Sequence, residues 1–156
     1  MCDTKLSATK FPMIKITKAR KNDFKKILSF YNECGYVGDT KKHNIILMAQ
    51  KENIIVGVVR LCTEYNKLVL RGMFISDKYQ KIGIGTQLLH ATLKVIKNKD
   101  CYALPYTHLE KFYKQVGFEK IIPVNAPGFL QKRLQQYKDM GLKIMIMKRV
   151  GKAYKR

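Results

Sequence analysis

The 156-residue chain has no long apolar run, since no hydrophobic stretch approaches the roughly 18 to 20 residues that a membrane-spanning helix needs. No signal-peptide apolar region follows Met1, so we expect a cytoplasmic protein without a membrane partner. Paired cysteines are also missing. Cys2, Cys34, Cys62 and Cys101 lie far apart, without Cys-x-x-Cys spacing or a nearby histidine, which predicts reduced thiols and no metal site.

Acidic residues are scarce, because 11 Asp and Glu stand against 31 Lys and Arg, a formal net charge of +20. Such an excess attracts polyanions, whether nucleic acid, an anionic membrane or an acidic substrate, and disfavours a polycationic substrate. Biased base content in the source genome would produce the same lysine-rich composition. The charge by itself leaves both explanations open.

The remaining composition is that of a soluble globular protein, with 46% hydrophobic and 27% charged residues. The length suits one domain. We expect a flexible lead-in at residues 1–12, one domain at 13–149 and a basic tail at 150–156. Strand-like and helical patterns interleave without internal repeats, which predicts an α/β fold.

One stretch organises the chain, because it predicts a strand, a polar turn and then a helix. The strand is the apolar run 68–75, and the turn is 76–80. Gly83 and Gly85 stand where the helix begins, and its apolar residues recur at three-to-four spacing up to Ile96. The first turn of a helix has unpaired N–H groups and attracts phosphate, glycine lets the backbone approach a ligand, and Lys81 adds a positive charge. The stretch therefore predicts a pyrophosphate site.

Two common pyrophosphate motifs fit it poorly. A Walker loop needs four residues between its glycines, followed by Lys and Ser or Thr, which this stretch lacks. A Rossmann fingerprint needs a third glycine where Leu88 stands, and its first glycine should follow the strand at once instead of after seven residues.

Further elements are predicted on both sides of this stretch. Asn22 or Asp23 can cap the first helix, and Thr107 with Glu110 reads as a capping box for a later one. The strand at 54–62 is apolar throughout, so it should be central. The other predicted strands are 13–19, 45–50, 101–104, 118–124 and 144–147, and the helices end at Gly35, Gly117 and Gly141.

The pattern Gln80-x-x-Gly83-x-Gly85 resembles the acetyl-coenzyme A loop of the GCN5-related N-acetyltransferase (GNAT) superfamily. About thirty residues further on, 112–118 resembles the superfamily's Phe-Tyr-x-x-x-Gly-Phe signature. The resemblance extends more loosely from Ile14 to Lys148. It implies a single-domain α/β fold with a mixed central sheet and flanking helices.

The resemblance also implies which residues bind acetyl-coenzyme A as cosubstrate. Backbone N–H groups of the loop would hold its pyrophosphate. The preceding strand has a bulge in this superfamily, so a main-chain N–H near Phe74 or Ile75 would face the acetyl oxygen, and the backbone there would pair with the pantetheine arm. The loop residues concerned are Gln80, Lys81, Ile82, Gly83, Ile84, Gly85 and Thr86.

Tyr113 matches the tyrosine that donates a proton to the departing thiolate in many members. A phenol with a pKa near 10 can serve a thiol whose pKa is about 8.5. The plain structural alternative is that Tyr113 packs beside Phe112.

The general base is not identified by the sequence. The central strands carry no carboxylate, and Glu64 lies at a turn, where a solvated charge is expected. His108 lies near the cofactor side, but it equally suits the surface of a first helical turn, whereas His43 and His90 have no partner in sequence. Many relatives have a cofactor-contacting asparagine where this chain has Tyr106, which could instead line the acceptor pocket or cover the core.

The function predicted from these residues is transfer of an acetyl group from acetyl-coenzyme A to a primary amine of a small molecule or protein, by direct attack on the thioester. Two alternatives stay open: a non-catalytic acetyl-coenzyme A sensor, and a nucleic-acid-associated basic protein. The net charge favours an acidic or nucleic-acid-bound acceptor over a polyamine. Either a monomer or a homodimer is compatible with the sequence.

Overall fold

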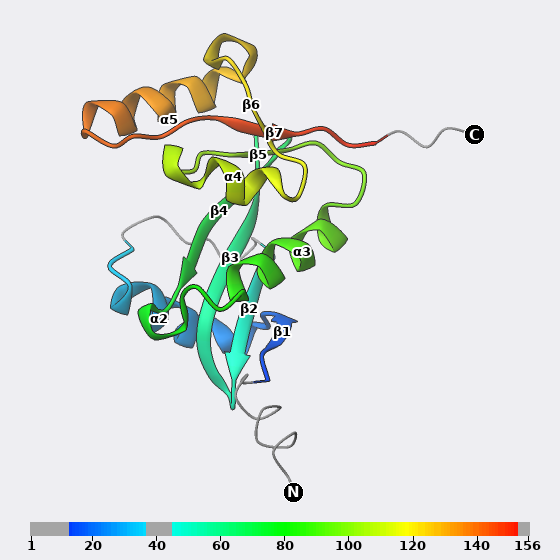
Figure 1. Cartoon of the computed structure of the whole chain (residues 1–156), viewed down its shortest axis with the longest axis vertical. Coiled ribbons are helices and arrows are strands. Elements are labelled where there is room, and N and C mark those ends of the chain that lie inside the picture. Colours follow the sequence, from blue (N-terminus) through cyan, green and yellow to red (C-terminus); the bar gives the residue numbers. More distant parts are fainter. Residues whose placement is uncertain (1–12, 37–44, 153–156) are drawn as a thin grey trace, which may run out of the picture.

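The computed structural model describes residues 13–36 and 45–152. Within them the chain forms a seven-stranded sheet in the order β1-β2-β3-β4-β5-β7-β6 (Figure 1). Neighbouring strands are antiparallel except β4 and β5. The sheet is therefore mixed, as predicted. The strands are β1 Lys15–Lys18, β2 Ile45–Lys51, β3 Ile54–Glu64, β4 Lys67–Ile75, β5 Cys101–Ala103, β6 Glu119–Lys120 and β7 Met147–Arg149.

Four α-helices flank the sheet in the described part of the chain: α2 Phe24–Glu33, α3 Ile84–Ile96, α4 Glu110–Lys114 and α5 Gly128–Asp139. Short 3-10 turns lie at Lys21–Asp23 (η1), Asp77–Tyr79 (η2), Thr107–Leu109 (η3) and Pro123–Asn125 (η4). The predicted glycine ends of the helices are confirmed, because Gly35, Gly117 and Gly141 all have positive φ just past a helix. No described helix is long and apolar enough to cross a membrane.

Two tight hairpins build the centre of the sheet. Glu52 and Asn53 join β2 to β3, and Tyr65 and Asn66 join β3 to β4, all with positive φ. Two consecutive residues with positive φ form a tight turn whose twist matches the twist of the paired strands. The hairpins make β3 a central strand, as predicted.

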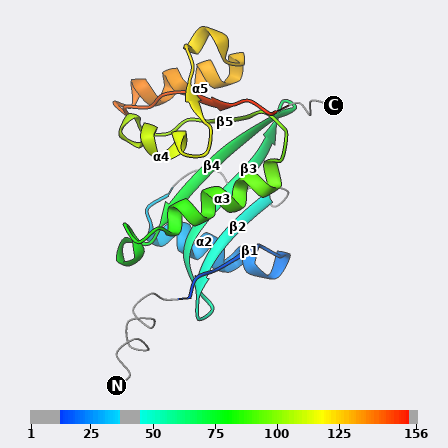
Figure 2. The ribbon, with the colours of Figure 1, turned by 45° about the vertical axis from the view of Figure 1, so that its right-hand side comes forward.

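The helices divide between the two faces of the sheet. Leu88 and Leu89 of α3 pack in one buried cluster with Val59 and Leu61 of β3. Val58, the neighbour of Val59, packs instead with α2, and α5 covers the same face further along. Figure 2 shows α3 lying across the long strands with α2 behind them. Side chains alternate between faces along a strand, so one face of β3 meets α3 and the other meets α2.

The predictions for the last two strands are wrong in their bounds. The strand expected at 118–124 shrinks to β6, because Pro123 starts a 3-10 turn and has no N–H for a ladder. The strand expected at 144–147 begins only at Met147. Ahead of it, the N–H of Met145 donates to the carbonyl of Pro105 at 3.1 Å, but Pro105 cannot donate in return, so the ladder is interrupted.

The predicted capping box is also wrong. Thr107 begins the η3 turn, α4 starts at Glu110, and neither element has a side-chain hydrogen bond at its cap. Asp23 does precede the first residue of α2, as predicted. Its carboxylate nevertheless accepts the backbone N–H of Arg20 at 2.8 Å and makes no cap bond within α2.

Candidate functional site

A bulge interrupts β4 shortly before its end. Val58 pairs with Phe74 and Arg60 pairs with Arg71, so two residues of β4, Gly72 and Met73, oppose one residue of β3. Gly72 has φ +60°, the left-handed conformation that glycine adopts readily at a bulge. The bulge that the resemblance implied is present, just ahead of Phe74.

One edge of β4 is open beyond this bulge. β5 pairs with residues 68–70 of β4 and ends at Ala103. From 71 to 75, the edge of β4 that faces away from β3 has no strand partner in the described ranges 13–36 and 45–152. The N–H of Ile75 faces this edge and is available to an extended ligand, whereas the Ile75 carbonyl accepts from Gln80 and the Phe74 backbone pairs with Val58 of β3.

The glycine loop, residues 80–86, joins the end of β4 to α3. The amide Nε2 of Gln80 donates to the carbonyl of Ile75 at 3.0 Å and to Asp77 Oδ1 at 3.2 Å, which ties the loop to the strand. Gly83 has φ +93°, and a Cβ built on it would meet no atom within 4 Å, so open space lies beside it. The N–H of Gln87 makes a helical bond at 3.0 Å to the Gly83 carbonyl.

That bond belongs to the first turn of α3, so the preceding N–H groups have no acceptor within the helix. They belong to Ile84, Gly85 and Thr86, and they stand at the positive end of the helix dipole. Lys81 and Ile82 lie exposed beside them. A helix start with free N–H groups, of the kind that suits an anion, therefore follows the open edge of β4 after residues 76–83.

The two glycines of the loop have different roles. A Cβ on Gly85 would stand 3.1 Å from Cζ of Phe112, so its absence makes room for that ring. Open space thus lies beside Gly83, whereas the Phe112 ring occupies the position beside Gly85; that both glycines let the backbone approach a ligand stays a prediction. Through this contact, α4 packs on the first turn of α3, and the two sequence motifs meet.

Tyr113 follows Phe112 and is 4% exposed. Its ring packs edge-on against Phe112 and Phe118, with centroids 5.2 and 5.9 Å away. Burial raises the pKa of the Tyr113 phenol above its ordinary value, so it keeps its proton. No side chain or backbone group in the described part hydrogen-bonds to its hydroxyl. The phenol is thus protonated and free to donate to a bound ligand.

Residues 15–127 match the family described as the acetyltransferase (GNAT) domain. The chain belongs to the GNAT family. No curated protein matches it significantly.

Solved structures show the same fold at low identity. N-acetylglutamate synthase from Neisseria gonorrhoeae, complexed with coenzyme A and N-acetyl-glutamate, is 16% identical with a TM-score of 0.67; the match covers 92% of this chain but only 36% of that one. Escherichia coli ElaA is 18% identical, with a TM-score of 0.66 and coverage of 88% of this chain and 99% of that one. The Escherichia coli ribosomal-protein-S18-alanine N-acetyltransferase is 12% identical, with a TM-score of 0.67 and coverage of 92% and 98%.

The other candidate residues of this GNAT domain lie in varied surroundings. Glu64, expected to be a solvated charge, instead accepts two hydrogen bonds from Arg133, at 2.7 and 3.1 Å, and lies 3.6 Å from Arg71. His108 stacks on Tyr106, with ring centroids 5.7 Å apart, and Tyr106 is largely exposed. His90 is exposed on α3, and His43 lies outside the described residues. The described residues hold no cluster of metal-binding side chains.

The sequence reasoning missed one residue entirely. Arg60 lies in the middle of β3, in a run interpreted as apolar throughout, and it is 0% exposed. Its guanidinium contacts Tyr31 and Tyr36, at the end of α2 and just beyond it. The available signal was a single arginine within an otherwise apolar strand.

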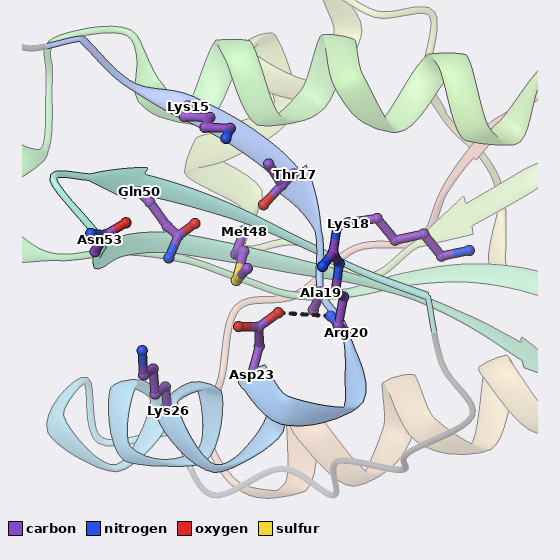
Figure 3. Close-up of a pocket in the computed structure, with 10 residues that line it drawn as sticks. All are labelled: Lys15, Thr17, Lys18, Ala19, Arg20, Asp23, Lys26, Met48, Gln50 and Asn53. Carbon is purple, nitrogen blue, oxygen red and sulfur yellow. Dashed lines mark hydrogen bonds between the residues drawn. The ribbon is translucent and has the colours of Figure 1, made fainter.

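A cavity of about 830 Å³ lies apart from the glycine loop. It opens between β1, the β2–β3 hairpin and the start of α2, on the face opposite α3 (Figure 3). Lys15, Lys18, Arg20 and Lys26 line it beside a single carboxylate, Asp23. Two strands, β2 and β3, separate β1 from β4, so this cavity is not part of the site formed by β4, α3 and α4.

Proposed function

We propose that this GNAT domain transfers an acetyl group from acetyl-coenzyme A to a primary amine of a small molecule or protein. One juxtaposition supports the proposal most: the anion-binding start of α3 packs, through Phe112, on the helix that carries the free Tyr113 hydroxyl. Membership of the GNAT family and the coenzyme A complex among the similar structures agree with it.

The glycine loop suits the pyrophosphate of the cosubstrate. Backbone N–H groups of residues 83–86 and the charge of Lys81 would bind it, and the space beside Gly83 would admit it. A side chain at Gly83 would narrow that space, and its φ of +93° would also strain any other residue. The residues present therefore fit the group.

The open edge of β4 suits the remainder of the cosubstrate, which supplies an acetyl group activated as a thioester. The N–H of Ile75, which faces this edge, would hold the arm or polarise the acetyl carbonyl, while Phe74 stays paired with β3. Such positioning can lower the barrier substantially, because the acetyl carbon and the amine are held in one geometry.

Tyr113 would donate the proton that the sulfur needs as it leaves. The phenol keeps this proton because burial raises its pKa. The amine attacks in its neutral form, and we assign no side chain as its base, since the carboxylate of Glu64 is engaged by Arg133. A neutral amine from solution can react without one.

The test is release of free coenzyme A thiol from acetyl-coenzyme A in the presence of an amine panel. The panel contains amino acids, because one similar structure holds N-acetyl-glutamate, and peptides with N-terminal alanine, because another is named for such an acceptor. Turnover with any amine supports the proposal. Binding of acetyl-coenzyme A without turnover across the panel would contradict it and favour the sensor alternative.

A further inference from the structure

Arg60 carries a charge that the described residues do not neutralise. Its side chain is completely buried in β3, yet no carboxylate in 13–36 or 45–152 forms a salt bridge with it. Removing a charge from water without an anionic partner costs free energy, which is why buried charges are nearly always paired. An unpaired guanidinium on a central strand therefore needs an explanation.

The partners that Arg60 does have are all neutral. Nη2 donates to the Tyr36 hydroxyl at 2.6 Å, Nη1 lies 3.9 Å from the Cys62 sulfur, and Nε has no partner. Burial raises the pKa of the Cys62 thiol and of the Tyr31 phenol, so neither supplies a negative charge at neutral pH. The rings of Tyr31 and Tyr36, 5.8 and 5.5 Å from the guanidinium carbon, offer cation–π attraction, and the neutral Tyr31 hydroxyl also interacts with Arg60.

The end of α2 holds these aromatic rings in place. The N–H of Tyr36 donates to the carbonyl of Tyr31 at 2.9 Å, and Gly35, with φ +75°, donates to Asn32 at 3.1 Å, which together form a Schellman motif. The Tyr36 ring then packs on Tyr31 and on Phe74, with centroids 4.6 and 5.2 Å away. The half-buried Tyr36 thus covers the terminal nitrogens of Arg60.

Arg60 also lies against the bulge of β4. The hydroxyl of Tyr31 donates to the carbonyl of Gly72 at 2.8 Å. A Cβ on Gly72 would stand 3.1 Å from Nε of Arg60, so the arginine directly adjoins the bulge. The guanidinium therefore adjoins Gly72, which lies three residues before Ile75, the residue whose N–H faces the proposed acetyl site.

The face of the sheet that carries Arg60 is the one left open to an acceptor. Met73 and Ile75 point toward α3, the side on which the glycine loop lies, whereas Phe74 points toward α2. With the cosubstrate held along the α3 side, an amine reaches the open edge of β4 from the α2 side. On that side Arg71 pairs directly opposite Arg60 and shares its carboxylate, Glu64, with Arg133. Three guanidinium groups against one carboxylate make this side of the sheet electropositive.

We propose that Arg60 binds a carboxylate of the acceptor, so that the substrates are amines that carry a carboxylate, such as free amino acids. The inference rests on the proposed function. The acceptor carboxylate replaces the Tyr36 hydroxyl at Nη2 and uses the Nη1–Nη2 edge of the guanidinium. Arginine suits this role because its planar donors match both oxygens of a carboxylate.

The experiment compares an amino acid with its own carboxamide, for instance L-alanine with L-alaninamide, as acceptors of the full chain. The two differ in charge at one group and little in size. Arg60→Gln should raise the KM for the amino acid about 10- to 100-fold, the range for a hydrogen bond to a charged group, and leave the carboxamide within about 3-fold. Arg20→Gln, an exposed arginine at the other cavity, is the matched control and should change neither.

Tyr36→Phe gives a second test with little risk to folding. It removes the hydroxyl that competes for Nη2, so the KM for the amino acid should fall or stay the same while that for the carboxamide is unchanged. An equal loss with both acceptors in Arg60→Gln, or a Tyr36→Phe variant that binds the amino acid more weakly, would overturn the inference.

The proposed function can be refuted separately from the inference about Arg60. If the parent chain uses the amino acid and its carboxamide with the same kcat/KM, the chain is an acetyltransferase and the inference about Arg60 is wrong. If no amine is turned over, thermal stabilisation of the acetyl-coenzyme A-bound chain by the amino acid, absent with the carboxamide and lost in Arg60→Gln, still supports the site. Equal or absent stabilisation by both compounds would refute it.

Discussion

Replacing Tyr113 with phenylalanine separates catalysis from packing. The change removes only a hydroxyl that makes no hydrogen bond within the described residues, so it leaves no partner unsatisfied. The ring contacts with Phe112 and Phe118 remain. The free energy of unfolding should therefore change by less than about 0.5 kcal/mol, as measured by chemical denaturation.

The effect on turnover should be far larger. Loss of a general acid typically lowers the rate about 10²- to 10⁴-fold, which corresponds to about 3 to 5 kcal/mol of barrier. The assay is kcat from thiol release, with the Kd for acetyl-coenzyme A measured alongside and expected to change little. Tyr102→Phe, a buried tyrosine of β5 near Lys148, is the control and should keep full kcat.

The pH dependence gives the same prediction a second readout. Burial raises the pKa of Tyr113, so its proton stays in place as the pH rises from 7 toward 10, and the acid form is not lost in that range. The acceptor becomes neutral over the same range, so kcat/KM should rise with pH. A Tyr113→Phe variant that keeps kcat within about 3-fold, or loses stability and activity in parallel, would refute the role.

Three further substitutions test the surrounding structure. Gly83→Ala should cost about 1 to 2 kcal/mol of stability because of its φ of +93°, and should weaken acetyl-coenzyme A binding in titrations. Gly85→Val should lower kcat because its side chain displaces Phe112, and Phe112→Leu in the same chain should restore part of the loss. Glu64→Gln should cost about 1 to 2 kcal/mol, since Arg133 loses a partner while about a fifth of each side chain remains exposed, and the pH profile of kcat should keep its shape because Glu64 is not the base.

Local patterns predicted the centre of this fold well. The strand, turn and helix from Leu68 to Ile96 are contiguous, and their apolar spacing and glycines carry the information within the segment itself. The β2–β3 hairpin was predicted equally well, because turn residues separate two apolar runs. The bulge in β4 came from the family resemblance, and Gly72 shows its physical cause.

Contacts between segments distant in sequence could not be predicted from the sequence. The missing ladder ahead of β7 depends on Pro105 lying opposite Met145, about forty residues away in sequence. Glu64 looked like a turn charge because Arg133, its partner, comes from α5. Arg60 was interpreted as part of an apolar strand, because its burial depends on one tyrosine of α2 and one in the turn that follows α2. In each case the deciding neighbour lies beyond any local window.

The most direct measurement is calorimetric titration of the chain with acetyl-coenzyme A, with NADH as a control dinucleotide. We expect acetyl-coenzyme A to bind with a Kd of about micromolar order, at the low end of the usual range for substrates, and NADH not to bind. Gly83→Ala, still folded, should bind more weakly, and Arg20→Gln should bind like the parent. No binding by the parent chain, or equal binding of NADH, would contradict the site formed by the glycine loop and the open edge of β4.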